Sequence, residues 1–325
     1  MKNSTVGSYA ALLAVISVWG ITPIFNKFIY NYYSPTVCST VSSLVALVGM
    51  LLISVGQLKS FNKDYLRIAL PTGLCNAVAS LLQKIGLEHT TPSSYAFLEN
   101  LSCVAVPILA FIFFKRRPAP MKLVAGVVCL VGCLVLSGLG ADGFSLGIGD
   151  ILCAAAGLLY SVNITVTGVY AERFVARLYV LVHMAVQLPV SLAATLILDV
   201  MLGGAEMAPA SLEIWPLVAI AAMTLISNVL CWTLRTSAMK RVDPTAVAVI
   251  MPLSAVVSGA LSVLAGMEEL TASLVLGGSV CLVAAALSGL SDVKTAKNAT
   301  RVPRFDKETV QIPGNSTSGD GPNQI

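Results

Sequence analysis

Charged residues are scarce in this sequence. Asp, Glu, Lys and Arg together make up 11% of its 325 residues, whereas hydrophobic residues make up 56%. A soluble globular domain carries about 25% charged residues, so this chain has too few charges to cover a surface that faces water. The solvent that tolerates an apolar exterior is lipid. The composition therefore excludes a string of soluble domains and predicts one long membrane domain that lies in a lipid bilayer.

Several motifs are also missing. None of the eight cysteines belongs to a CxxC pair and each lies in a hydrophobic run, so we interpret them as small packing residues and expect no metal site. The motif GxxxxGK[ST], which would hold ATP, does not occur. The N-terminal segment lacks a small-residue cleavage site, so we expect no cleaved signal peptide. We expect no cofactor and no nucleic-acid partner.

Ten hydrophobic runs reach the length of about 20 residues that a helix needs to cross a bilayer. They lie at 9–29, 35–55, 66–86, 92–114, 121–139, 149–169, 178–199, 214–237, 244–266 and 272–290. Short linkers with Gly and Pro separate them. Residues 291–325 are polar and rich in Ser, Asn, Gly and Pro, which predicts a disordered tail. The sequence therefore predicts an all-α integral membrane protein with ten transmembrane helices.

The distribution of charge predicts the orientation of these spans. With the N-terminus in the cytoplasm, the inner segments carry nearly all the Lys and Arg residues of the loops. Cytoplasmic loops are the ones that retain positive charge. The outer loops then carry the acidic residues Asp142, Glu206, Glu213, Glu268 and Glu269. We therefore expect a multi-pass protein of the cell membrane with both termini in the cytoplasm.

The two halves of the chain resemble each other. An offset of 152 residues aligns spans three to five with spans eight to ten without a gap, pairing Asn76 with Asn228, Ser102 with Ser254 and Cys129 with Cys281. Because each half has five spans, the second copy must be inverted in the membrane. We predict one repeat over 1–140, an inverted repeat over 141–290 and a cytoplasmic tail over 291–325. Inverted repeats are typical of transporters, and channels can also be built in this way.

Spans five and ten carry small residues at every fourth position. These are Ala125, Cys129, Cys133 and Ser137 in the first repeat, and Gly277, Cys281, Ala285 and Gly289 in the second. Such faces allow helix backbones to approach closely. We interpret both spans as packing helices, or as the interface of a homodimer, away from the solute.

Polar residues inside the spans indicate a binding site, because a polar group in a membrane helix costs free energy unless it faces partners or water. Most of these residues recur at three, four or seven positions and so share a helix face. The candidate substrate-binding residues are Trp19, Asn26, Asn76, Gln83, Tyr95, Glu99, Asn100, Tyr160, Asn163, Asn228 and Trp232. The candidates for a coupling or ion-pairing role are Glu99, Lys27 and Arg235.

Glu99 has two interpretations that the sequence leaves open. As a functional group, it takes up a coupling proton or binds a cationic solute. As a structural group, it pairs with Lys27 or Lys84, which are also expected toward the outer face. Arg235 lies near the inner end of span eight, and we expect its side chain to extend to the cytoplasmic interface.

An enzymatic alternative rests on one tetrapeptide. Gly147-Ile148-Gly149-Asp150 matches the GxGD motif of intramembrane aspartyl proteases. That chemistry needs two carboxylates that share a proton, and Asp199 lacks the usual flanking tyrosine. We interpret Asp150 instead as a charge at the N-terminus of a helix and expect that the protein is not an enzyme.

Several motifs together give a family resemblance. They are Val18-Trp19-Gly20 with Asn26-Lys27 and Ser34-Pro35, the Gly149-Asp150 entry to the second half, and Gly266-Met267-Glu268-Glu269-Leu270-Thr271 before Gly277-Gly278. With these residues the chain resembles the drug/metabolite transporter superfamily of the EamA-domain type. The resemblance implies a central pocket, alternating access and export of amino acids, other metabolites or drugs. The stretch from Phe25 to Tyr32 also looks like the triose-phosphate and nucleotide-sugar translocator branch.

The resulting hypothesis is a secondary active transporter that exports small metabolites or drug-like solutes through a central pocket. Its expected partners are the bilayer, a small solute and a coupling proton or counter-solute. An organic-phosphate or nucleotide-sugar exchanger, a channel and a GxGD protease are the alternatives.

Overall fold

The computed structural model of this chain describes residues 2–91, 95, 98–115, 120–136, 147–201, 213–267 and 269–299, without the side chains of 2–5 and 289–299. All regular elements within these residues are helices. Seven helices are long and apolar enough to cross a membrane, and three further apolar helices, Ser102–Phe114, Pro120–Val135 and Ala272–Ser288, are shorter. The predicted all-α membrane fold is confirmed, with seven of the expected spans at full membrane length.

The helices follow one another in the order that the sequence predicts. The first half holds α1 (Lys2–Ile29), α2 (Pro35–Ser54), a 3₁₀ turn (Val55–Ser60), a π-helical turn (Tyr65–Ala69), α3 (Leu70–Glu88), α5 (Ser102–Phe114) and α6 (Pro120–Leu136). The second half holds α7 (Ile148–Tyr170), a 3₁₀ turn (Ala171–Arg173), α8 (Ala176–Ala194), a π-helical segment (Thr195–Met201), α9 (Ile214–Thr224), a π-helical segment (Leu225–Cys231), α10 (Trp232–Ala238), α11 (Pro244–Ile250), α12 (Leu253–Leu264) and α13 (Ala272–Ala299).

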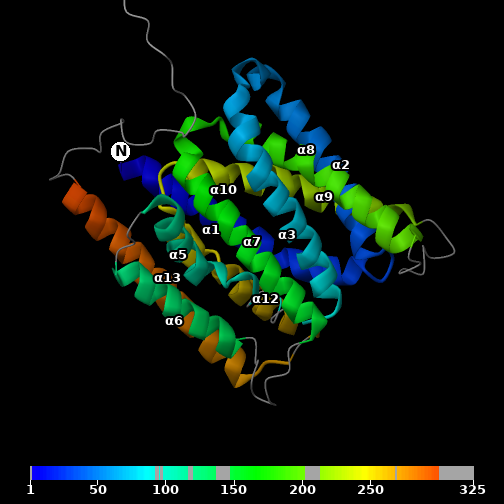
Figure 1. Cartoon of the computed structure of the whole chain (residues 1–325). Coiled ribbons are helices and arrows are strands. Elements are labelled where there is room, and N and C mark those ends of the chain that lie inside the picture. Colours follow the sequence, from blue (N-terminus) through cyan, green and yellow to red (C-terminus); the bar gives the residue numbers. More distant parts are fainter. Residues whose placement is uncertain are drawn as a thin grey trace, which may run out of the picture.

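The helix contacts reflect the two repeats (Figure 1). α3 and α5 of the first half pack on α7 of the second, and α10 and α12 of the second half pack in the same way on α1 of the first. The pairs α2 with α8 and α6 with α13 join equivalent spans of the two repeats. Exchanging the repeats therefore leaves this contact pattern unchanged, as expected when two similar units are related by a pseudo-twofold axis.

Close helix packing depends on glycine at two positions. A Cβ atom at Gly20 of α1 would lie 2.6 Å from Cβ of Val257 on α12, and a Cβ at Gly157 of α7 would lie 2.5 Å from the carbonyl oxygen of Leu98. Any larger residue would push the partner segment away. These two contacts hold span nine against span one and span four against span six.

Two membrane helices are interrupted at equivalent places. Asn100 and Leu101 form a turn before α5, and Met251 and Pro252 form a turn between α11 and α12. With the 152-residue offset, Asn100 corresponds to Pro252. Proline has no N–H to bond to the preceding turn, which explains the second interruption. Each repeat therefore has a discontinuous helix in its fourth span.

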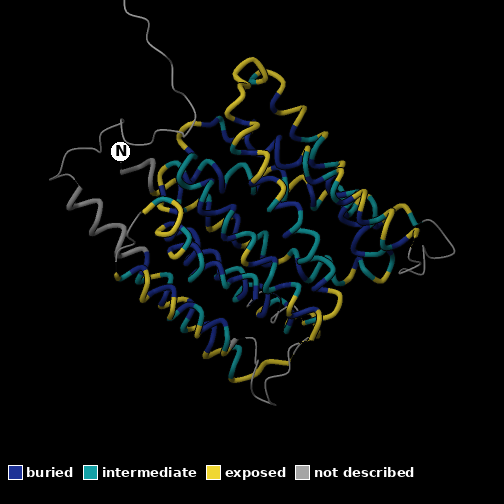
Figure 2. Tube along the Cα trace, viewed as in Figure 1, coloured by how far each residue is buried: buried dark blue, intermediate teal, exposed yellow. Residues whose placement is uncertain are grey.

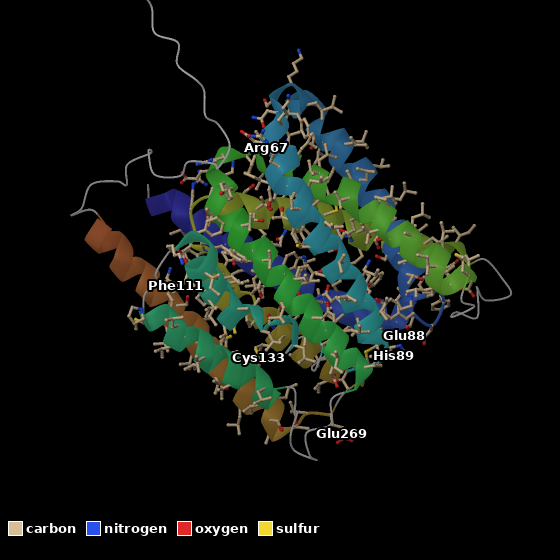
Figure 3. All side chains as sticks on the ribbon, in the orientation of Figure 1. Arg67, Glu88, His89, Phe111, Cys133 and Glu269 are labelled. Carbon is tan, nitrogen blue, oxygen red and sulfur yellow. The ribbon has the colours of Figure 1, made fainter. Side chains whose placement is uncertain are left out.

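Exposed residues occur along the outside of the bundle (Figure 2), and many of them are large hydrophobic residues. Val124, Val127 and Val131 on α6 are 50–57% exposed, and many large hydrophobic residues on the other helices are similarly exposed. The two ends of the bundle differ: Arg67 lies at one end, and Glu88, His89 and Glu269 lie toward the other (Figure 3). This arrangement fits a multi-pass protein whose sides contact lipid.

α6 and α13 pack along one edge of the bundle, as their small residues predict. A Cβ at Gly132 would lie 2.9 Å from the backbone nitrogen of Cys281, so the two backbones are close. α13 continues to Ala299, beyond the predicted end of its span at residue 290. The rest of the predicted tail, residues 300–325, lies outside the described part of the chain.

Candidate functional site

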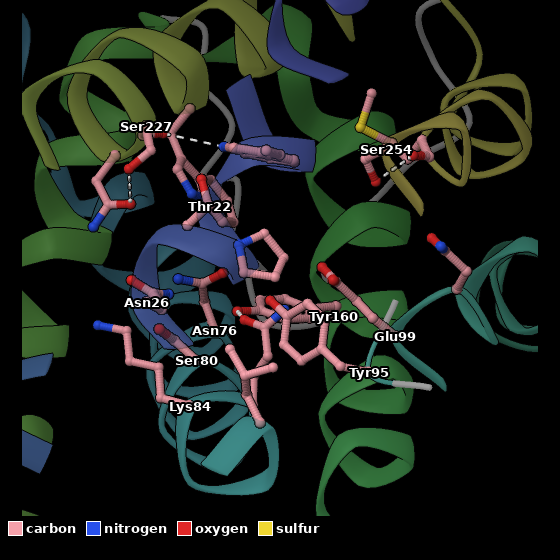
Figure 4. A pocket seen from close by; sticks show the side chains of 18 of the residues that line it. Thr22, Asn26, Asn76, Ser80, Lys84, Tyr95, Glu99, Tyr160, Ser227 and Ser254 are labelled. Carbon is pink, nitrogen blue, oxygen red and sulfur yellow. Dashed lines mark hydrogen bonds between the residues drawn. The ribbon is translucent and has the colours of Figure 1, made fainter. Parts of the chain in front are cut away.

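One cavity of about 120 Å³ lies inside the bundle. That is several times the roughly 10–15 Å³ that one ordered water needs. The lining residues come from both halves of the chain and are Trp19, Thr22, Pro23, Asn26, Asn76, Ser80, Gln83, Lys84, Leu87, Tyr95, Glu99, Asn100, Ser102, Tyr160, Ile164, Gln187, Ser227, Asn228, Trp232, Arg235, Met251, Ser254 and Ser258. In Figure 4, Asn26, Asn76 and Lys84 lie on one side, with Tyr95, Glu99 and Tyr160 opposite them.

The structure brings together nearly all the residues that the sequence singles out. Every predicted substrate-binding residue except Asn163 lines the cavity. Asn163 is fully buried between α7 and α3, where its Nδ2 donates to the carbonyl oxygen of Thr72 at 3.4 Å. We therefore interpret Asn163 as a residue that joins two helices. Whether the other residues bind a solute stays a prediction.

The lining contains pairs of repeat-related residues. With the 152-residue offset, these pairs are Asn76 with Asn228, Ser80 with Trp232, Gln83 with Arg235, Glu99 with Met251, and Ser102 with Ser254. Both members of each pair face the same space, so the cavity lies where the two repeats meet. The charges are not symmetric, because Glu99 in the first repeat corresponds to a methionine and Arg235 in the second corresponds to a glutamine.

Glu99 lies at the helix interruption before α5 and forms no ion pair with any described residue. Its carboxylate is in hydrogen-bonding reach of the Gln83 side chain. The Oε1 atom of Gln83 in turn accepts a hydrogen bond of 2.8 Å from the Tyr160 hydroxyl. The predicted structural pair of Glu99 with Lys27 or Lys84 is therefore wrong for this structure. Side chains from α3 and α7 orient this carboxylate instead.

Arg235 also differs from the sequence-based expectation. It is 3% exposed and lines the cavity, so the expectation that it extends to the cytoplasmic interface is wrong. Its guanidinium carbon lies 4.7 Å from the ring centroid of Trp232 and 5.8 Å from that of Trp19. Cation–π attraction stabilises an arginine between such rings. The Trp19 indole is fixed by a hydrogen bond of 3.3 Å to the carbonyl oxygen of Ser227.

Lys27 does not line the cavity. Its Nζ atom donates to the carbonyl oxygens of Leu87 at 2.9 Å and Thr90 at 2.7 Å, at and just beyond the end of α3. The last carbonyl groups of a helix lack partners within the helix and attract positive charge. In this structure Lys27 therefore closes the end of α3, and its predicted coupling or ion-pairing role stays a prediction.

The two aspartates of the protease alternative have separate structural partners. Asp150 accepts hydrogen bonds from the Thr90 hydroxyl at 2.6 Å and from the backbone nitrogen of Gly147 at 2.9 Å. Asp199 accepts from the hydroxyls of Ser34, at 2.6 Å, and Thr36 beside the N-terminus of α2. Neither residue lines the cavity, so this geometry gives no support to an aspartyl dyad.

Three thiols meet away from the cavity. The Sγ atoms of Cys129, Cys133 and Cys281 lie within 4.8 Å of one another between α6 and α13, close enough to hold a soft metal ion. Cys129 and Cys281 each lie 3.8 Å from a backbone carbonyl oxygen, and Cys133 lies 3.5 Å from Cys281. Their complete burial at a tight helix contact agrees with the packing role predicted from the sequence.

The binding residues predicted from the sequence do not include several that line the cavity. These are Thr22, Ser80, Lys84, Ser102, Gln187, Ser227, Met251, Ser254 and Ser258, with the apolar Pro23, Leu87 and Ile164. The repeat offset could have found some of them, because Met251 and Ser254 correspond to Glu99 and Ser102. Serine alone gives little signal, since it also packs and caps inside membrane helices.

The fold and the cavity define a multi-pass membrane protein with a polar site between two repeats. The EamA-like transporter family matches residues 5–138 and again 147–290, and the chain belongs to this family. An uncharacterized transporter of Archaeoglobus fulgidus is 26% identical over 162 residues, which span about half of each chain, 50% of this one and 49% of that one. A crystal structure that is 16% identical shares the fold, with a TM-score of 0.68 over 91% of this chain and 99% of the other.

Proposed function

We propose that this protein is a secondary active transporter that exports a small organic solute through the cavity by alternating access. The single observation that carries this proposal is that the cavity is lined by repeat-related pairs such as Asn76 with Asn228. A site shared by two inverted repeats can be opened to either side when the repeats exchange conformations. Membership of a transporter family supports a carrier and not an enzyme.

The interrupted helices supply the flexible positions for this exchange. The turns at Asn100–Leu101 and Met251–Pro252 lie beside the cavity residues Glu99 and Met251. Because the regular backbone hydrogen bonds of the helix are interrupted there, the two parts of each helix can tilt relative to each other at a low cost in free energy. Solute binding and helix movement are then coupled at the same two places.

Glu99 is the proposed coupling group. It is the only carboxylate among the described residues that line the cavity, and it forms no direct ion pair with another described residue. A carboxylate in such a site can take up a proton when the solute leaves and release it when the solute binds. The proposal also places both termini in the cytoplasm and the protein in the cell membrane, on the basis of loop charge.

Flux into proteoliposomes tests the proposal. A screen of amino acids, polyamines, nucleosides and quaternary amines should find saturable flux of one solute class, which is lost in Asn228→Ala. In Glu99→Gln, flux driven by a pH gradient should disappear while solute exchange survives. Asn31→Ala is the control, because Asn31 is exposed and bonds only to the carbonyl oxygen of Phe28. Non-saturating current at ion-channel rates would show a channel and overturn the carrier.

A further inference from the structure

The charges that face the cavity do not balance. Among the described lining residues, Lys84 and Arg235 are cationic and Glu99 is anionic. No ion pair joins any of them to another described residue. The lining therefore carries one positive charge in excess: Lys84 and Glu99 of the first repeat balance each other in number, and Arg235 of the second repeat has no lining carboxylate in its own repeat.

Of the two cations that line the cavity, Arg235 is the one with a buried donor atom recorded without a partner. Its Nε atom is buried and has no hydrogen-bond partner among the described residues. Trp232 and Trp19 contact the guanidinium group through their rings, at 4.7 and 5.8 Å. Ring contacts leave the N–H groups unbonded, because these point outward in the guanidinium plane. A buried cation with unbonded donors is costly unless a partner arrives.

The other shielded cations show what a completed environment looks like in this protein. Lys27 donates to carbonyl oxygens at the end of α3, and Lys122 lies 3.1 Å from the carboxylate of Asp243. Both lie outside the cavity. The carboxylate of Glu99 likewise has Gln83 as a partner. Arg235 thus differs from Lys27 and Lys122 in that it has a buried donor atom without a partner, inside the space that a solute would enter.

We infer that the transported solute carries a carboxylate, and that Arg235 is its receptor in the cavity. A guanidinium group matches a carboxylate with two parallel N–H···O bonds, which a point charge such as lysine cannot reproduce. One carboxylate also neutralises the single excess charge of the lining. The inference rests on the proposed transport function, which it deepens by naming the class of solute.

Paired probes test the inference on the full-length protein in detergent. Benzoate, hexanoate and L-leucine are compared with benzamide, hexanamide and L-leucinamide by their effect on the thermal unfolding temperature. At least one carboxylate should bind about tenfold or more tightly than its amide, the value expected for hydrogen bonds to a charged group. Comparing the affinity of L-leucine with that of hexanoate shows whether an amino group strengthens binding. Phenyl phosphate tests whether an organic phosphate binds at the same site.

Variants connect this preference to one residue. Arg235→Gln should abolish the difference between carboxylate and amide, and Arg235→Lys should retain only part of it. Arg177→Gln is the matched control, because Arg177 is exposed at the start of α8, away from the cavity. If Arg235→Gln does not fold, Arg235→Lys still tests the paired N–H contacts.

Three results would overturn the inference. They are equal binding of carboxylates and amides to the wild type, a preference that survives in Arg235→Gln, and binding of phenyl phosphate alone. A stability loss in Arg235→Gln that Glu99→Gln restores would show a structural ion pair instead. Saturable flux of a neutral or cationic solute would overturn this inference and leave the carrier intact, whereas carboxylate binding without any flux would overturn only the carrier.

Discussion

The hydroxyl group of Tyr160 on α7 donates a hydrogen bond of 2.8 Å to Oε1 of Gln83 on α3. The Gln83 side chain is in turn in reach of the carboxylate of Glu99, the only carboxylate among the described lining residues. A side chain of the second repeat thus holds a residue beside the carboxylate of the first.

Tyr160→Phe should weaken solute binding while the fold is kept. The substitution removes one hydrogen bond, worth about 0.5–1.5 kcal/mol, so the half-saturating solute concentration should rise roughly two- to tenfold. Flux measurements in proteoliposomes give this value. Tyr170→Phe is the control, because Tyr170 contacts Phe114 and lies outside the cavity lining. An unchanged half-saturating concentration would mean that the Gln83 amide needs no support from Tyr160.

Gly157→Ala should destabilise the protein and reduce flux. The new Cβ atom would lie 2.5 Å from the carbonyl oxygen of Leu98 and 2.8 Å from that of Glu99. Overpacking of this kind costs about 1–3 kcal/mol and displaces the backbone that carries the carboxylate. The thermal unfolding temperature should fall. Gly56→Ala, where no atom lies within 4 Å of the new Cβ, should leave it nearly unchanged, and equal effects of the two variants would refute the steric explanation.

Asp243 should stabilise the protein in two ways, through its ion pair with Lys122 and through a helix cap. Asp243 Oδ1 lies 3.1 Å from the Lys122 ammonium group and accepts a bond of 2.9 Å from the backbone nitrogen of Thr245. Asp243→Asn keeps a good capping residue, whereas Asp243→Ala loses about 1 kcal/mol of capping in addition. The Asp243 side chain is half exposed but Lys122 is buried, so both variants should also lose stability because a buried ammonium group is left without its carboxylate. The thermal unfolding temperature of Asp243→Asn should be higher than that of Asp243→Ala. An equal decrease in both variants would mean that Asp243 stabilises the protein through the ion pair and not through the cap.

The segments at Lys63 and Glu269 should lie on opposite sides of the membrane. The loop charges place Lys63 in the cytoplasm and Glu269 outside, and the structure has Arg67 and Glu269 toward opposite ends of the bundle (Figure 3). Reporter fusions that are active on only one side of a membrane give the answer directly. Activity of both fusions on the same side would refute the predicted inverted arrangement.

The sequence predicts much of this fold because two strong signals coincide. Apolar runs give the helices, and the 152-residue offset relates one half to the other. The same periodicity selects the cavity residues, since Asn76 and Asn228 lie on equivalent helix faces. The interruptions of the fourth spans were not predicted, because Pro252 in one repeat corresponds to Asn100 in the other and only proline disrupts the backbone hydrogen bonds by its own structure.

The errors concern the partners of charged side chains. Position along a span suggested that Arg235 reaches the interface, yet its guanidinium group lies beside the rings of Trp19 and Trp232. Lys27 is one residue from the lining residue Asn26, and this single step along the helix directs it to the carbonyl groups of α3 instead. Loop and helix-end carbonyls carry no side-chain signal, so a sequence alone does not identify them as partners.

Glu99 and Met251 each occupy a cavity wall and the interruption of a membrane helix. A substitution at either position that changes which solute fits will also change how the adjoining backbone bends. Selectivity and turnover are therefore expected to vary together in variants at these two residues. Altering preference without slowing the transport cycle should be easier at Asn26 or Ser80, which lie on uninterrupted helices.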